Sequence, residues 1–122
     1  MTLAELSVQG KALLNKKHSQ ENWEAYHFPK FVFTSSAVKT GYKIAVKNPD
    51  MLSKLPRYCF CNTMGHQSLA YCFLKDGKLG DGYDDHASNC NICYGEAMFA
   101  FLWTDLGATD KDILEKLKEV FG

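Results

Sequence analysis

The crowding of the cysteines into the middle of the sequence is the feature that most constrains this chain. All five cysteines lie in one stretch, as Cys59-x-Cys61, then Cys72, then Cys90-x-x-Cys93. A Cys-x-Cys pair together with a Cys-x-x-Cys pair is typical first of a metal site and second of disulfides. The odd number excludes full pairing within one chain. One thiol must therefore be free, bound to a metal, or paired between chains of a homo-oligomer.

The Cys-x-x-Cys pair is expected to open a helix. Asn89 can cap a helix that starts with Cys90 and runs to about Trp103. Thiols at positions i and i+3 of a first helical turn point the same way. The free amides and the positive end of the helix dipole stabilise thiolates there. The sequence therefore predicts one half of a metal clamp at Cys90 and Cys93.

The Cys-x-Cys pair can supply the other half of the clamp. In a strand the side chains of Cys59 and Cys61 would diverge, so a turn is needed for both to face one ion. Pro56 just before and Gly65 just after favour such a turn. Four sulfurs would complete a tetrahedral shell, which suits zinc, copper(I) or an iron–sulfur cluster. The alternative is that these cysteines are buried apolar residues or structural disulfides.

Four more residues in the same stretch are candidates for the site. Cys72 lies on an expected core face, so it is either a further ligand or a buried core residue. His86 follows two aspartates and is either a ligand oriented by a carboxylate or a surface loop residue. His66 allows ligand, cap and loop roles. Met64 can offer a thioether to copper(I) or pack on aromatic rings.

Apolar spacing and capping residues predict an all-α fold, a small bundle of about five to six helices with an irregular cysteine-rich middle. A segment from Trp23 to Phe33, broken by Pro29, is expected to be a short strand or a loop. Asp76 to Asp85 is expected to be a mobile loop. The expected helices are a first one from the capping box Thr2-Leu3-Ala4-Glu5 to about His18, one from Thr34–Ser36 to about Lys47, one from Asn48-Pro49 to Pro56, Gln67 to Leu74, Cys90 to about Trp103, and Thr109 to Phe121.

Length and charge narrow the class of protein. A chain of 122 residues is expected to form a single domain, 1–122, made of an N-terminal helix and aromatic segment (1–33) and a cysteine-rich helical region (34–122). Its 14 basic and 14 acidic side chains balance, which argues against a nucleic-acid partner or an anionic membrane. No apolar stretch is long enough to span a bilayer. The start shows no signal peptide, so the protein is cytosolic or an export segment has been removed.

No catalytic motif stands out. A Gly-rich phosphate loop, GxSxG and HExxH are all absent from the sequence, so an enzyme is not expected. A thiol–disulfide redox protein is one alternative, although the βαβ context of a thioredoxin-like motif is missing. A module carrying haem or an iron–sulfur cluster is another. Covalent c-type haem attachment is excluded by motif, because Tyr94 rather than histidine follows Cys93.

A longer run of motifs carries a family resemblance. The quoted elements are Pro56-Arg57-Tyr58-Cys59-Phe60-Cys61, Gly65-His66-Gln67-Ser68, Cys72, Asp85-His86 and Cys90-Asn91-Ile92-Cys93. From about Ser36 to Gly122 the chain resembles the bacterial PCYCGC-motif proteins, which are small and mostly exported lipoproteins. The resemblance implies metal or copper handling outside the cytoplasm. It leaves the first 30 residues unassigned.

Two positions depart from that family's motif. Arg57 stands where the family has its first motif cysteine, and Phe60 stands where it has glycine. Arg57 would place a fixed positive charge beside the thiolates, so we expect it next to the ligands rather than among them. The first hypothesis is therefore a metal-binding protein for copper or zinc, with copper slightly favoured because a Cys-x-Cys, a methionine and a histidine suit a soft exchangeable ion.

Overall fold

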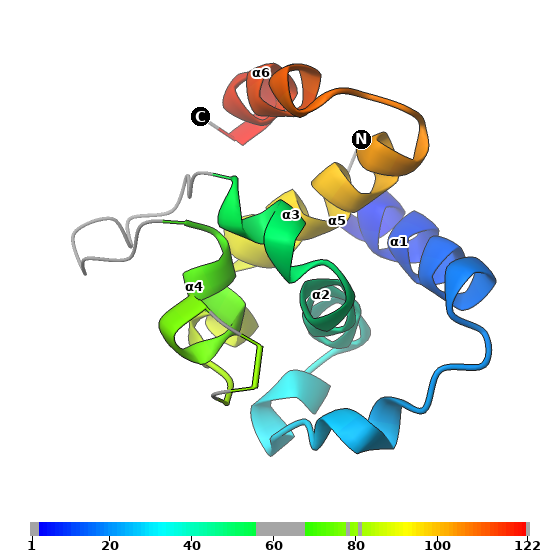
Figure 1. Cartoon of the computed structure of the whole chain (residues 1–122), viewed down its shortest axis with the longest axis vertical. Helices are drawn as coiled ribbons and strands as arrows, with labels where there is room; N and C mark the ends of the chain where they lie inside the picture. The colour runs from blue at the N-terminus through cyan, green and yellow to red at the C-terminus, as the bar shows by residue number, and fades with distance from the viewer. Residues whose placement is uncertain (1–2, 56–67, 78, 81, 122) are drawn as a thin grey trace.

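The computed structural model describes residues 3–55, 68–77, 79–80 and 82–121 (Figure 1). These residues confirm the predicted all-helical class, with six α-helices and no named strand in the described parts of the chain. The elements in chain order are α1 (Leu3–Lys17), the 3-10 helices η1 (Trp23–Tyr26) and η2 (Lys30–Phe33), α2 (Ser36–Lys47), α3 (Pro49–Ser53), α4 (Ala70–Phe73), the 3-10 helices η4 (Lys75–Gly77) and η5 (His86–Asn89), α5 (Asn91–Asp105) and α6 (Asp110–Phe121).

Helix α5 is the centre of the packing. Every residue from Gly95 to Phe101 is buried, so the helix has no solvent-facing stripe over two turns. A helix that is apolar nearly all round must be covered on several sides. Helices α1, α2 and α6 pack against it, and Figure 1 shows α1 and α2 beside it. The core therefore runs along α5, which carries Cys93 near its first turn.

Helix α2 begins as predicted and approaches its neighbours closely. The hydroxyl of Ser35 accepts a hydrogen bond from the amide of Val38 at 3.2 Å, which caps the helix. One turn later, a Cβ added at Gly41 would lie 2.8 Å from Cβ of Tyr94 and 3.2 Å from Cε1 of Phe73. Only glycine fits that spacing without movement of a neighbour. Gly41 thus sets how near α2 lies to α4 and α5.

Two 3-10 helices form the aromatic segment, so of the two predicted alternatives, a short strand or a loop packed on the core, the strand is wrong. Pro29 precedes η2, and the amide of Val32 donates to its carbonyl at 3.1 Å. Local bonds of this kind satisfy the backbone of a segment that has no neighbouring strand to pair with. The ring of Phe28 stacks on Tyr26 and contacts Tyr83, so the segment is held by aromatic packing on the body of the fold.

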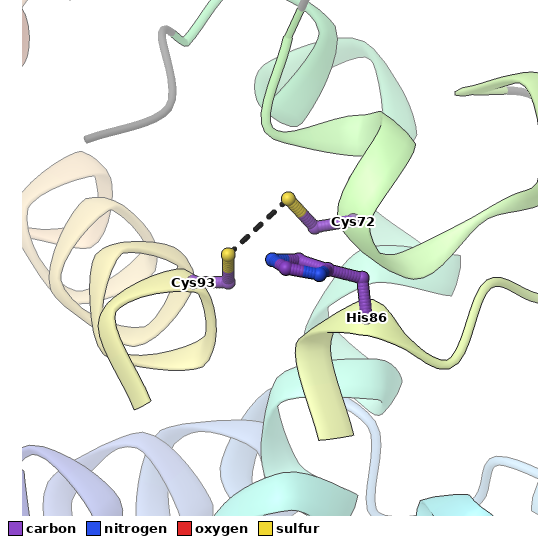
Figure 2. A group of neighbouring side chains, drawn as sticks. All are labelled: Cys72, His86 and Cys93. Carbon is purple, nitrogen blue, oxygen red and sulfur yellow. Dashed lines mark hydrogen bonds between the residues drawn. The ribbon is translucent and has the colours of Figure 1, made fainter. Parts of the chain in front are cut away.

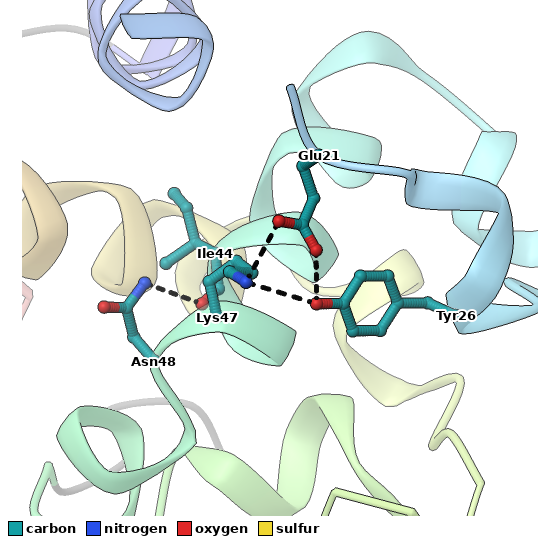
Figure 3. Close-up of polar contacts among 5 residues, drawn as sticks. All are labelled: Glu21, Tyr26, Ile44, Lys47 and Asn48. Carbon is teal, nitrogen blue, oxygen red and sulfur yellow. Dashed lines mark hydrogen bonds and ion pairs between the residues drawn. The ribbon is translucent and has the colours of Figure 1, made fainter. Parts of the chain in front are cut away.

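A polar group ties this aromatic segment to the end of α2 (Figure 3). Tyr26 donates to one carboxylate oxygen of Glu21 at 2.8 Å, and the Lys47 ammonium lies 3.2 Å from the other. Lys47 also lies 3.3 Å from the Tyr26 hydroxyl. These bonds lower the pKa of Glu21, chiefly through Tyr26 and then Lys47. Asn48 is the N-cap residue of α3, directly before Pro49, as predicted, but its side chain makes no capping bond and donates to the carbonyl of Ile44 at 3.0 Å.

The segment from 76 to 85 folds back on itself and places η5 beside α4. The amide of Lys75 donates to the carbonyl of Gly82 at 3.1 Å, and the amide of Asp84 donates to the carbonyl of Phe73 at 2.9 Å. Asp76 and Gly77 both have positive φ, of 57° and 69°, which produces the sharp reversal. As a result, Phe73 at the end of α4 is bonded through its carbonyl to the amide of Asp84, two residues before η5.

Helix α6 follows its predicted signals closely. Thr109 and Asp112 bond reciprocally, with the amide of Asp112 donating to the threonine hydroxyl at 3.2 Å and the amide of Thr109 donating to the carboxylate at 3.3 Å. The helix buries Ile113 and Leu117 against α5. In the described parts of the chain, no helix is long and apolar enough to cross a membrane.

Candidate metal centre

Three potential metal ligands meet where α4, η5 and α5 converge (Figure 2). Cys72 comes from α4, His86 is the first residue of η5, and Cys93 lies in the first turn of α5. The sulfur atoms of Cys72 and Cys93 are 3.2 Å apart. One ring nitrogen of His86 and both sulfurs lie within 4.8 Å of one another, and Figure 2 shows the imidazole directed between the two thiols. The arrangement offers two soft sulfur ligands and one imidazole to a single ion.

Burial differs among the three ligands. Cys72 and Cys93 have no exposed surface, whereas His86 is partly exposed. His86 is held in place by its own backbone, because its amide donates to a carboxylate oxygen of Asp84 at 2.8 Å. Tyr42 donates its hydroxyl to the carbonyl of Asp84, and its burial raises its pKa above the ordinary value.

The predicted start of α5 is wrong by one residue. Asn89 is the last residue of η5 and does not cap α5; Cys90 is the N-cap, and the helix runs from Asn91 to Asp105. The cause is that residues 86–89 form a 3-10 helix of their own. Asn89, the residue expected to cap α5, belongs to that 3-10 helix instead. Cys90 and Cys93 then occupy the N-cap and N3 positions, whose side chains face each other at a helix start.

Hydrogen bonds among the described thiols shift the pKa values of Cys90 and Cys93 in opposite directions. Cys93 donates to Cys72, and its hydrogen bonds with Cys72 and Cys90 together with burial raise its pKa. The pKa of Cys90 is lowered to about 5, chiefly by its hydrogen bond with Cys93 and also by His86, against the opposing effect of burial. The lowered pKa of Cys90 and the raised pKa of Cys93 favour a thiolate at Cys90 and a protonated thiol at Cys93. A metal ion must displace that proton to bind both sulfurs.

The structure brings together part of the predicted ligand set. Cys93 and the two residues predicted as additions, Cys72 and His86, form the tight group, and Cys90 borders it. Cys72 was predicted to be either a buried core residue or a further ligand. It is buried in the core and also lies next to the other candidate ligands, so the two alternatives are compatible. The remaining candidates lie outside the described residues, and their roles stay predictions: Cys59, Cys61, Arg57, Met64 and His66.

Sequence reasoning missed one buried acid beside the site. Glu96 has no exposed surface and lies one turn after Cys93 on α5. Glu96 is the single charged residue between Tyr94 and Trp103, where the other residues are aromatic, aliphatic or small. A single acid inside such a run was the available signal, because an apolar helix rarely buries a carboxyl group without a specific role.

The fold and the cysteine–histidine cluster define a small helical protein with a candidate metal centre. Over residues 9–122 the chain matches a family model described as a protein of unknown function with PCYCGC motif. The chain therefore belongs to the PCYCGC-motif family, and the match begins well before Ser36, where the resemblance seen in the sequence starts. Searches of curated proteins and of solved structures found no match.

Proposed function

We propose that this protein binds a copper or zinc ion through Cys72, Cys93 and His86, with Cys90 as a fourth ligand. The observation that carries the proposal is the grouping of the three ligand atoms within 4.8 Å of one another. Cys90 is included because its thiol interacts with both Cys93 and His86. A binding role is proposed rather than a catalytic one, since the sequence contains no Gly-rich phosphate loop, GxSxG or HExxH motif.

The sulfur separation supports a four-coordinate ion. With metal–sulfur bonds of about 2.3 Å, two thiolates lie about 3.8 Å apart in a tetrahedral shell and about 4.6 Å apart on either side of a linear ion. The observed separation of 3.2 Å between Cys72 and Cys93 needs an opening of roughly 0.6 Å for the first case. The linear case needs more than twice that movement between two fully buried side chains.

Charge supports the same assignment. Three thiolates and a neutral imidazole leave a charge of about −1 around zinc and about −2 around copper(I). Cys72 and Cys93 are fully buried, so excess negative charge is unfavourable there. The amides at the start of α5 offset only about half a unit. Among the two ions, the described ligands therefore favour zinc, while the sequence argument for copper rests on Met64 and the Cys-x-Cys pair.

Metal analysis of purified protein tests the proposal. We expect about one equivalent of metal, retained by wild type and lost when Cys72 and Cys93 are both replaced by serine. Cobalt(II) added to metal-free protein should give sulfur-to-metal charge-transfer absorption, with intense visible bands if the site is tetrahedral. The control is His27→Gln, which removes an exposed histidine outside the cluster. A Cys59→Ser/Cys61→Ser variant measured in parallel tests separately whether the Cys-x-Cys pair adds ligands. Full metal content in the Cys72→Ser/Cys93→Ser variant would refute the site.

A thiol–disulfide redox role is the second candidate, favoured by the same 3.2 Å contact and by the Cys90 thiolate. In this role the Cys90 thiolate attacks an external disulfide RSSR, breaks its S–S bond and releases RS⁻. Cys93 then attacks the Cys90 sulfur and releases the second RS⁻, while its own proton goes to one leaving thiolate. In sum, the Cys90 thiolate and the Cys93 thiol are oxidised to a disulfide, and RSSR is reduced to one thiol and one thiolate.

Glutathione disulfide separates the two candidates. Metal-free protein incubated with it should lose two hydrogens by mass spectrometry if the redox role holds, with the bond mapped to Cys90–Cys93 or Cys72–Cys93. Protein loaded with metal should resist the same treatment if metal binding is the function, because its thiolates are engaged. Equal oxidation with and without metal would favour the redox role.

A further inference from the structure

We propose that a pocket between the aromatic segment and α2 binds a small organic anion with a flat, apolar ring. The pocket has a volume of about 410 Å³, which lies within the range of small-molecule sites. Aromatic side chains from η1 and η2 form one side, and two lysines of α2 form the other. It lies apart from the cysteine cluster, and the inference does not depend on the metal proposal.

The aromatic side supplies a flat apolar surface. Trp23, Phe28 and Phe33 line the pocket, and Phe33 is 58% exposed. Phe28 and Phe33 meet edge to face with ring centroids 6.4 Å apart. A large exposed phenylalanine next to two other rings gains free energy when a planar ligand covers it. The surface therefore suits a ring of about the size of naphthalene better than an aliphatic chain.

The opposite side carries two positive charges, neither of which is in an ion pair among the described residues. Lys39 and Lys43 are four residues apart on α2, so their side chains leave the same face of the helix. Both are partly buried, and neither forms an ion pair with a carboxylate of the residues that the structure describes. Like charges at this spacing repel each other. An anion placed between them would remove that repulsion.

The contacts of Lys43 strengthen the argument. Its ammonium lies 4.9 Å from the centre of the Trp23 ring, so the charge is already positioned over the aromatic side. Burial lowers the pKa of Lys43, and the neighbouring charges of Lys39 and Lys11 lower it further. A carboxylate beside Lys43 would have its attached ring against Trp23. Ring and charge are thus arranged for one molecule.

The rim adds a donor and a restriction. His27 lines the pocket and has a φ of 52°, a left-handed conformation that is uncommon outside glycine. Its exposed ring can donate a hydrogen bond to an anion. Glu24 also lines the pocket and is exposed. Its single negative charge against two lysines favours ligands with one or two negative charges over highly charged ones.

A pair of matched probes tests the proposal. The probes are 2-naphthoate and 2-naphthamide, which share shape and differ in charge, and the readout is the indole N–H signal of Trp23 in NMR titrations. Trp103, the second of the two tryptophans, serves as the internal reference. We expect 2-naphthoate to shift the Trp23 signal saturably, to leave Trp103 unchanged, and to bind about tenfold more tightly than 2-naphthamide, as two exposed ion pairs allow.

Substitutions then locate the charge. Lys39→Gln/Lys43→Gln should weaken 2-naphthoate binding about tenfold and leave 2-naphthamide unchanged. The control is Lys75→Gln/Lys111→Gln, which removes two exposed lysines elsewhere. Equal affinity for the two probes, or an unchanged affinity in the Lys39→Gln/Lys43→Gln variant, would overturn the proposal. So would sedimentation with phosphatidylglycerol vesicles without saturable 2-naphthoate binding, which would assign the lysines to a membrane surface.

Discussion

Replacing Gly41 by alanine is expected to destabilise the fold and to weaken the metal site together. The new methyl carbon would lie 2.8 Å from Cβ of Tyr94 and 3.5 Å from its Cα, which are atoms that cannot swing aside. It would also lie 3.2 Å from a ring carbon of Phe73. Tyr94 follows Cys93 and Phe73 follows Cys72 in the chain, so the movement that relieves the clash also displaces the two sulfurs.

The free-energy cost of the clash at Gly41 can be separated from the gain in helix stability by comparison with a second helical glycine, Gly10. Overpacking of this kind costs about 1–3 kcal/mol. Replacing glycine by alanine inside a helix also gains about 0.5–1 kcal/mol from reduced backbone freedom. At Gly10 in α1 the added carbon would lie 3.5 Å from Thr40 Cγ2 and 3.5 Å from Met98 Cγ, which is ordinary contact. Gly10→Ala should therefore show the gain alone, and the difference between the variants should be about 1–3 kcal/mol.

Urea unfolding of both metal-free variants measures that difference, and competition with a chromophoric chelator measures metal affinity. Metal binding should be weaker in Gly41→Ala than in Gly10→Ala. If Gly41→Ala is as stable as Gly10→Ala, the close approach of α2 does not limit the packing. If it is less stable but binds metal equally well, α2 does not control the separation of Cys72 and Cys93.

Further expectations follow from single side chains. His86→Gln should weaken metal binding at least about tenfold by chelator competition, whereas exposed His27→Gln should leave it unchanged. Thr109→Ala should lower the free energy of unfolding by about 1 kcal/mol in urea, since it removes the N-cap of α6; an unchanged midpoint would contradict this. The pKa of Glu21 lies below its ordinary value of 4.5, so the ionised carboxylate stabilises the fold at pH values above 4.5. That stabilisation is lost as the pH falls and Glu21 is protonated, so the free energies of unfolding of wild type and Glu21→Gln should converge on acidification. Arg57→Ala should reduce metal affinity roughly tenfold, more at low salt, and an unchanged affinity would remove Arg57 from the site.

Helices with strong local signals were predictable from the sequence. Ser35 before α2 and Thr109 before α6 combine a capping side chain with a helical spacing of apolar residues, and both cap as expected. Local chemistry alone decides such boundaries. The aromatic segment was not predictable in the same way, because Phe28, Phe31 and Phe33 fit a strand as well as a packed turn. Its structure depends on contacts with Tyr42 and Tyr83, which are distant in sequence.

The sequence singled out the three residues that the structure groups, but it did not predict their grouping. Spacing indicated Cys90 and Cys93 as a pair, since two thiols in one helical turn must lie near each other. Nothing local indicated that Cys72 would lie 3.2 Å from Cys93, because that distance depends on the fold-back of residues 76–85 and on the closeness that Gly41 permits. The same fold-back brings His86 to the sulfurs, so long-range packing turned two secondary candidates into central ones.

An ion bound at the candidate centre would couple metal binding to folding. Cys72 and Cys93 belong to elements that the chain joins only through the loop after α4, so an ion that binds both sulfurs acts as a cross-link. A ligand that binds only the folded state adds about 4.1 kcal/mol at a thousandfold excess over its dissociation constant. That is a large share of the roughly 5–15 kcal/mol that stabilises a typical domain.

A protein that transfers its metal to a partner must keep its fold without that contribution. The burial of α5 against α1, α2 and α6 is independent of the ion and can supply the remainder. The stability of the metal-free protein therefore distinguishes a metal-handling protein from one whose metal is structural. A fold that persists without metal favours metal handling, and a fold that is lost without metal favours a structural site.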